Sequence, residues 1–170
     1  MTGKWIGAML VIAGCGGLGF SIAAASKREE AALRDLVSAL DYMECELKYR
    51  LTPLPELCLQ AGAENKGSVR QILAALSREL ESQISPDVES CMNAALVTCR
   101  DVPGRVRQAF EIMGKSLGRF DMEGQIQGLE AVRAYCRREL DIMGQNRDSR
   151  LRSYQTLGLC AGAALAILFV

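Results

Sequence analysis

The sequence predicts an all-α protein, a single antiparallel bundle of about six helices whose first and last helices continue into membrane spans. Apolar residues recur at spacings of three and four through the middle of the chain, and no alternating strand pattern accompanies them. Each of the four prolines falls where a helix is expected to start. Apart from Lys4, every charged residue lies between Lys27 and Arg152, so two uncharged ends flank a charged middle.

The first apolar end predicts an N-terminal transmembrane helix within residues 1–26. Residues 5–26 run without a charge, as WIGAMLVIAGCGGLGFSIAAAS. At about 1.5 Å per residue, a helix of this length crosses a hydrocarbon core of about 30 Å. Trp5 stands where an interfacial aromatic belongs, and Lys27 and Arg28 follow the span directly.

The second apolar end, residues 153–170, predicts a C-terminal transmembrane helix. Arg147, Arg150 and Arg152 precede it, and Tyr154 can sit at the interface. Basic residues therefore border the middle domain, residues 27–152, on both sides. By the positive-inside rule this domain lies in the cytoplasm and the two spans form a hairpin.

Small residues recur at helical spacing in both spans and could let helix backbones approach closely. Those expected to pack are Gly17, Ser21, Gly158 and Gly162. Glycine and alanine are also common in membrane helices without any such role, and both interpretations stay open.

The first span also allows an alternative, in which the middle domain is exported. Ile12-Ala13-Gly14-Cys15 resembles a bacterial lipobox, and Ala23-Ala24-Ala25 resembles a small-residue cleavage site. The product would be a lipid-anchored helical scaffold protein. Against it, the apolar run continues past Cys15 to Ser26, basic residues follow, and the chain has an odd number of cysteines.

Six helices are expected in order along the chain. The first continues from the span to about residue 51, with an apolar face of Leu33, Leu36, Val37, Leu40, Met43 and Leu47. Thr52 is expected to cap a short second helix that has Pro53 at its first position and ends near residue 61. Ser68 with Gln71 forms a capping box for a third helix that extends to about residue 84.

The remaining three helices follow the same rules. Ser85-Pro86-Asp87 predicts the start of a fourth, and Pro103 opens a fifth that ends near Gly118. Asp121 caps a long sixth helix, whose apolar face is Ile126, Leu129, Val132, Cys136, Leu140 and Met143. Helices one and six should pair antiparallel and form a stalk toward the membrane.

The composition argues against an enzyme and predicts no cofactor or metal. There is no histidine, which removes the usual general base of a catalytic triad, and no glycine-rich phosphate loop. The seven cysteines form no C-x-x-C pair, and the five in the middle domain are expected as small apolar core residues. The paired acids Glu29-Glu30 and Glu44 with Glu46 are expected as solvated surface. With 20 basic and 20 acidic residues, no nucleic-acid footprint is visible.

Over its whole length the chain resembles the stage III sporulation protein AB family of endospore-forming bacteria. The resemblance rests on order and spacing, from Lys4 and Ile6-Gly7-Ala8 through Glu46, Tyr49, Thr52-Pro53-Leu54, Leu117-Gly118, Asp121 and Gln125 to Tyr154, Leu157-Gly158 and Gly162. It implies a bundle similar to the type II secretion system F, or platform, domain. It also implies a structural subunit of a secretion or channel complex between mother cell and forespore.

The resemblance also implies partners and a surface. The expected partners are other sporulation channel subunits, including a secretion-type ATPase, and further copies of this chain, on the mother-cell side of the membrane around the forespore. No small-molecule substrate is implied. The residues expected at a protein-interaction surface are Thr52, Pro53, Leu54, Leu117, Gly118, Asp121 and Gln125. Local helix capping is the competing role for most of them.

Overall fold

The protein folds as an all-α bundle, as the sequence predicts. The computed structural model describes the backbone of residues 2–50, 52–82, 87–117 and 122–169, and the side chains of residues 24–50, 52–82, 87–117 and 122–145. Within these ranges there are six helices and no strand: α1 (Thr2–Tyr49), α2 (Leu54–Ala63), α3 (Gly67–Ser82), α4 (Val88–Thr98), α5 (Gly104–Ser116) and α6 (Met122–Phe169).

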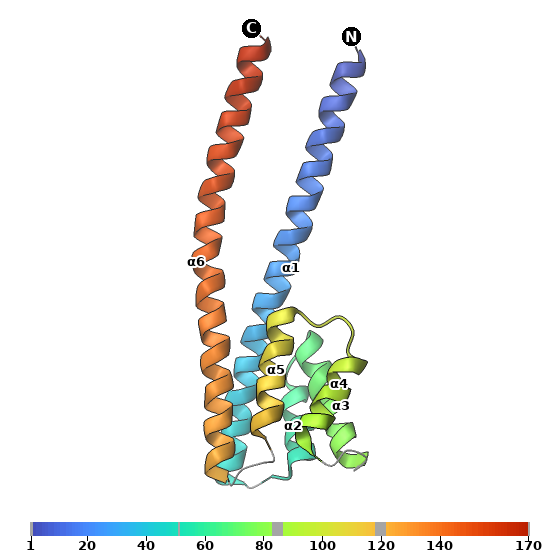
Figure 1. Cartoon of the computed structure of the whole chain (residues 1–170), viewed down its shortest axis with the longest axis vertical. Helices are drawn as coiled ribbons and strands as arrows, with labels where there is room; N and C mark the ends of the chain where they lie inside the picture. The colour runs from blue at the N-terminus through green and yellow to red at the C-terminus, as the bar shows by residue number, and fades with distance from the viewer. Residues whose placement is uncertain (1, 51, 83–86, 118–121, 170) are drawn as a thin grey trace.

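The helices alternate in direction, and α1 and α6 lie side by side and antiparallel (Figure 1). Both long helices project beyond the bundle in the same direction, so the two chain termini lie at the same end (Figure 1). We call the end from which they project the stalk end; it carries residues 64–67 and 99–105. The opposite end, with residues 49–50, 52–54, 117 and 122–125, is the free end. The structure thus confirms the antiparallel pairing of the first and last helices.

The core contains buried side chains from all six helices. The predicted apolar face of α1 is buried, with Leu33, Leu36 and Met43 at 0% exposure, and Phe110 of α5 is equally buried. Each such side chain contributes about 1.5 to 3 kcal/mol through removal of apolar surface from water. On α6, Leu129, Val132 and Cys136 complete this core.

Two glycines let α5 pack tightly between its neighbours. A Cβ at Gly114 would lie 2.8 Å from the Cβ of Met92 on α4, and a Cβ at Gly128 of α6 would meet that of Ser116. Any side chain at these positions would push the helices apart, because such separations are shorter than van der Waals contact. The sequence analysis did not single out either glycine.

Several helix starts differ from the expected ones. Pro53 precedes α2 with extended backbone angles (φ −56°, ψ 141°), so the helix begins at Leu54, and Thr52 does not cap it. At α4 the cap is Asp87, whose carboxylate accepts a hydrogen bond from the Ser90 backbone N–H at 3.3 Å. The expected helix starts at Ser85, Pro86 and Asp121 lie outside the described residues.

Within the residues whose side chains are described, no helix is both long and apolar enough to cross a membrane. The predicted spans, residues 1–26 and 153–170, fall almost entirely outside this part of the chain. So do Cys15 and the small residues expected to pack in the membrane, which are Gly17, Ser21, Gly158 and Gly162. The two membrane helices therefore remain predictions.

Candidate functional site

The two junctions expected to form an interaction surface lie together at the free end of the bundle (Figure 1). One joins α1 to α2 and carries Thr52, Pro53 and Leu54; the other joins α5 to α6 and carries Leu117 and Gln125. Helix alternation explains this, because α1 and α5 both run toward the free end while α2 and α6 both start there. Gly118 and Asp121 lie outside the described residues.

The α1–α2 junction is held by Glu46. The Thr52 hydroxyl donates a hydrogen bond of 3.0 Å to Glu46 Oε2, and the Arg50 guanidinium lies 3.5 Å from Glu46 Oε1. Glu46 is only 8% exposed. The expectation that this acid is solvated surface is therefore wrong, since its carboxylate fixes the turn that leads into α2. Thr52 does not cap α2 because Pro53 occupies the N-cap position of that helix.

The apolar members of the predicted set act through packing. Leu117, the last residue before the α5–α6 junction, is fully buried, and Leu54 is partly buried against the same core. Pro53 is exposed, whereas Gln125 is partly buried and has an interaction partner. Of the seven residues, only Pro53 offers a partner a well-exposed side chain among those the structure describes.

Two exposed side chains at the free end were missed by the sequence analysis. Tyr49, the last residue of α1, is 82% exposed, and Met122, the first of α6, is 46% exposed. Tyrosine is enriched among the residues that dominate binding energy at protein interfaces, and methionine adapts to irregular partner surfaces. The signal for Tyr49 lay in its place among the residues that carry the family resemblance.

The comparisons with known proteins identify the family of the chain. The family model described as stage III sporulation protein AB matches residues 4–170. The chain belongs to the stage III sporulation protein AB family. This family is a structural component of sporulation and not a known enzyme family.

A solved structure supports the same fold for family members. The chain titled "Stage III sporulation protein AB (SpoIIIAB)" superposes with a TM-score of 0.64 at 18% sequence identity; the match covers 72% of this chain and 98% of that chain. At this identity the likeness shows the fold. No curated protein sequence matches the chain.

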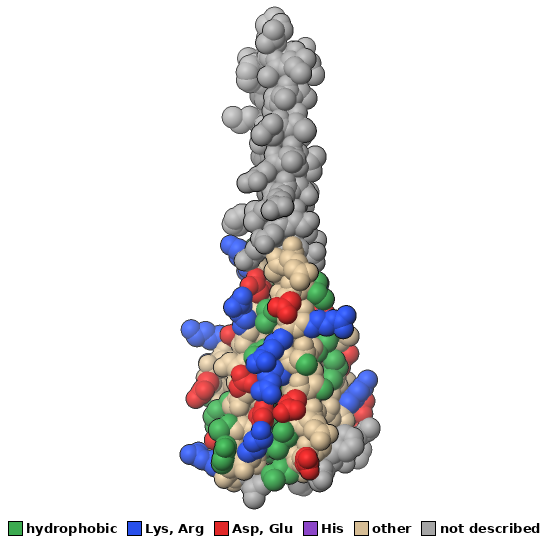
Figure 2. Space-filling model, turned by 90° about the vertical axis from the view of Figure 1, so that its left-hand side faces the viewer, with side chains coloured by type: hydrophobic (Ala, Val, Ile, Leu, Met, Phe, Trp, Pro, Cys, Tyr) green, Lys and Arg blue, Asp and Glu red, His purple; other side chains and the backbone are tan. Residues whose placement is uncertain are grey.

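In this family member, ion pairs fasten α6 to α1 along the bundle. The Arg133 guanidinium of α6 lies 2.7 Å from Asp41 Oδ1 and 2.8 Å from Glu44 Oε2 of α1. A hydrogen bond from Lys48 and the charge of Arg133 hold the pKa of Glu44 below its ordinary value. Acidic and basic side chains interleave over the face that α6 occupies (Figure 2).

A second set of ion pairs joins three helices at the stalk end. Arg105 of α5 lies 2.8 Å from Glu29 Oε2 of α1 and 2.7 Å from Glu139 Oε2 of α6. Its backbone N–H also donates to Glu29 Oε1 at 3.1 Å. Pro103 makes no side-chain cap for α5, so Glu29 satisfies a free donor of that helix from another part of the chain. Glu29 too was wrongly expected as solvated surface.

The described residues offer little chemistry at the cysteines. Burial raises the pKa of the Cys58 thiol to about 12, and burial, with a smaller effect of Glu139, raises that of Cys136 to about 12. Cys91 is also buried, as expected, whereas Cys45 is exposed, contrary to the expectation of a core position. Among the residues that the structure describes, no group of three cysteine or carboxylate side chains could hold a metal ion.

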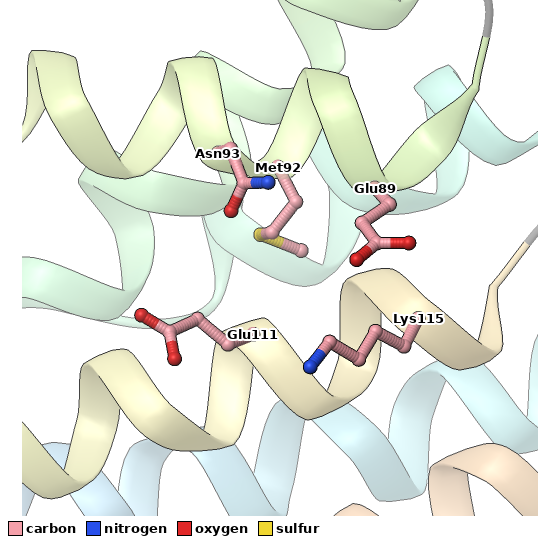
Figure 3. Close-up of a pocket in the computed structure, with 5 residues that line it drawn as sticks. All are labelled: Glu89, Met92, Asn93, Glu111 and Lys115. Carbon is pink, nitrogen blue, oxygen red and sulfur yellow. The ribbon is translucent and has the colours of Figure 1, made fainter.

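A cleft between α4 and α5 is too small to suggest a small-molecule site. It has a volume of about 190 Å³ and is lined by Glu89, Met92, Asn93, Glu111 and Lys115. In Figure 3 the first three project from α4 toward the other two on α5, so the cleft is the polar rim of a helix contact. Pockets for small ligands are typically about 300 to 1,000 Å³ and mostly apolar.

Proposed function

We propose that the chain is a membrane-anchored structural subunit of a sporulation-specific secretion or channel complex between mother cell and forespore. In this proposal its bundle lies in the mother-cell cytoplasm and resembles the platform domain of type II secretion systems. The bundle works by protein contacts: its free end receives a partner, which we take to be a secretion-type ATPase. Further copies of the chain and other channel subunits complete the assembly.

The proposal rests on one observation: the stalk end and the free end lie at opposite ends of the bundle. The helices that lead to the two predicted membrane spans leave at the stalk end, and Tyr49, Pro53 and Met122 are presented at the other (Figure 1). A subunit anchored at one end and exposed at the other can contact a soluble partner without interference from the bilayer. Membership of the sporulation family over residues 4–170 supplies the biological setting.

Buried free thiols support a cytoplasmic bundle. Cys58 and Cys136 are buried and form no disulfide within the described structure. Free thiols persist in reducing compartments, whereas exported proteins more often pair their cysteines.

A photo-crosslinking amino acid tests the docking surface directly. Placed at Tyr49 in the full-length chain and activated in sporulating cells, it should form a specific adduct with another protein. The matched control is Leu59, on the outer face of α2 and 52% exposed. Adducts of equal yield at Tyr49 and Leu59 would contradict docking at the free end.

Topology is tested with the exposed thiol that the chain already carries. Cys45 should be protected from an impermeant thiol reagent in intact mother cells and labelled once the membrane is permeabilised. A Cys45→Ser chain with Glu64→Cys repeats the test at a second exposed position. Labelling of either position in intact cells would favour the exported, lipid-anchored scaffold instead.

A further inference from the structure

An open basic groove lies between α3 and the α4–α5 connection. It has a volume of about 690 Å³, and Arg70, Arg78, Arg100 and Asp101 are its charged lining residues. The other lining residues are Gly67, Gln71, Ala74, Thr98 and Cys99. Three positive charges therefore face one negative charge.

The arginines of this groove differ from four other arginines of the bundle. Arg34, Arg50, Arg105 and Arg133 each lie within 4 Å of a carboxylate. Within the described residues none of the three groove arginines does so, and Arg78 bonds only the Ala74 carbonyl, at 3.2 Å. Their donors therefore remain available to an anion, and guanidinium groups match the geometry of a phosphate well.

Part of the groove lining, Gly67 and residues 98–101, lies at the stalk end. The start of α5 lies beside Glu29 of α1, because the Arg105 backbone N–H donates a hydrogen bond to the Glu29 carboxylate. Glu29 is three residues after Ser26, where the first predicted span ends. Three residues of helix correspond to about 5 Å. Arg100 lies in the connection that leads to this point, and so within reach of a membrane surface potential, which decays over about 8 to 10 Å.

An exposed apolar side chain stands beside the groove. Val97, in the last turn of α4 and next in sequence to Thr98 of the groove, is 76% exposed, whereas Cys91, Met92, Ala95 and Leu96 of this helix are buried. Arginines next to an exposed apolar side chain are typical of surfaces that rest on lipid headgroups.

We propose that this groove binds the phosphodiester headgroup of anionic phospholipids and so holds the stalk end against the bilayer. The inference rests on the proposed membrane anchoring and adds to it a lipid preference. A lipid headgroup is favoured over an acidic protein segment, because Gly67 and residues 98–101 of the lining lie at the stalk end, from which the two long helices project.

The test measures lipid preference in the full-length chain. The chain is titrated in neutral detergent with phosphatidylglycerol or phosphatidylcholine, and bound lipid is counted by native mass spectrometry. The wild-type chain should prefer phosphatidylglycerol, and the Arg70→Gln/Arg100→Gln variant should lose about 30-fold in that preference. This figure corresponds to about 1 kcal/mol for each basic residue near an anionic surface.

The matched control is Arg137→Gln/Arg138→Gln, which removes two exposed arginines from α6. It should keep the preference within about threefold, since its charges lie outside the groove. Equal losses in both variants would overturn the proposal, because the lipid would then respond to net charge only. Far-UV circular dichroism checks that both variants keep the helical fold.

Other outcomes identify a different ligand or a different failure. Competition by millimolar inorganic phosphate would overturn the lipid assignment in favour of a free anion. Binding of polyglutamate by a chain that shows no preference for phosphatidylglycerol would overturn it in favour of an acidic protein segment. Flotation separates the two proposals: failure to float with pure phosphatidylcholine vesicles contradicts membrane anchoring itself, whereas flotation without lipid preference contradicts only the groove.

Discussion

The sharpest prediction concerns Glu29, which holds the start of α5 although it belongs to α1. Its carboxylate accepts from the Arg105 backbone N–H at 3.1 Å and from the Arg105 guanidinium at 2.8 Å. The side chain of Glu29 is only 16% exposed. Replacing it with alanine removes a helix cap, which contributes about 1 kcal/mol, and an ion pair, which contributes about 0.5 kcal/mol because Arg105 is partly solvated.

Glu29→Ala should therefore lower the free energy of unfolding by about 1.5 kcal/mol, or the Tm by about 6 °C for a domain of this size. Thermal unfolding of the full-length chain in neutral detergent, followed by far-UV circular dichroism, measures the change. Glu139→Ala is the matched control, since it removes an ion pair of 2.7 Å from the same arginine but no helix cap. If both variants lost the same stability, capping of α5 by Glu29 would be refuted.

Three further predictions follow from the same structure. Gly144→Ala should raise the free energy of unfolding by about 0.5 to 1 kcal/mol, since nothing lies within 4 Å of the added Cβ. Gly114→Ala should lower it by about 1 kcal/mol or more, because the added Cβ would meet Met92. Thermal unfolding measures both changes, and a shift of the Tm in the same direction for both variants would contradict the packing. The pKa of Glu44 is lowered, so its contribution is present above its ordinary pKa of 4.5 and is lost as the pH falls through the folded value. The Tm difference between wild type and Glu44→Gln should accordingly shrink in acid, and a constant difference would contradict the ion pairing. At pH 8, iodoacetamide should alkylate Cys45 rapidly but Cys58 only after unfolding, because burial raises the Cys58 pKa to about 12; peptide mass spectrometry measures both rates.

Apolar periodicity was sufficient to predict the helices and the core. The face of α1 from Leu33 to Leu47 is buried as expected, because residues spaced three and four apart share one side of a helix. The helix starts were less predictable. Thr52 is a residue type that often caps helices, yet Pro53 takes the N-cap position of α2 and the Thr52 hydroxyl donates to Glu46 instead. Such contacts depend on how the chain turns between the helices.

Contacts between distant helices could not be predicted from local patterns. Glu29 and Glu46 looked like solvated acids because nothing beside them in sequence shows that Arg105, 76 residues away, or the turn after α1 would bury them. The same limit applies to the candidate site. The order and spacing of the residues that carry the family resemblance pointed to both junctions at the free end. The exposure of Tyr49 and Met122, in contrast, depends on the tertiary packing of α1 and α6.

Ion pairs join α1 and α6 at two heights of the bundle. Arg105 of α5 pairs with Glu29 of α1 and Glu139 of α6 at the stalk end. Arg133 of α6 pairs with Asp41 and Glu44 of α1, nearer the free end. Two fastenings at different heights resist rotation of one helix about the other, which a single one would permit. Because α1 and α6 are each continuous through the bundle, a load applied to the free end is carried into the stalk by rigid helices. The platform role proposed above requires stiffness of this kind, and a break introduced into α1 at the stalk end should weaken it.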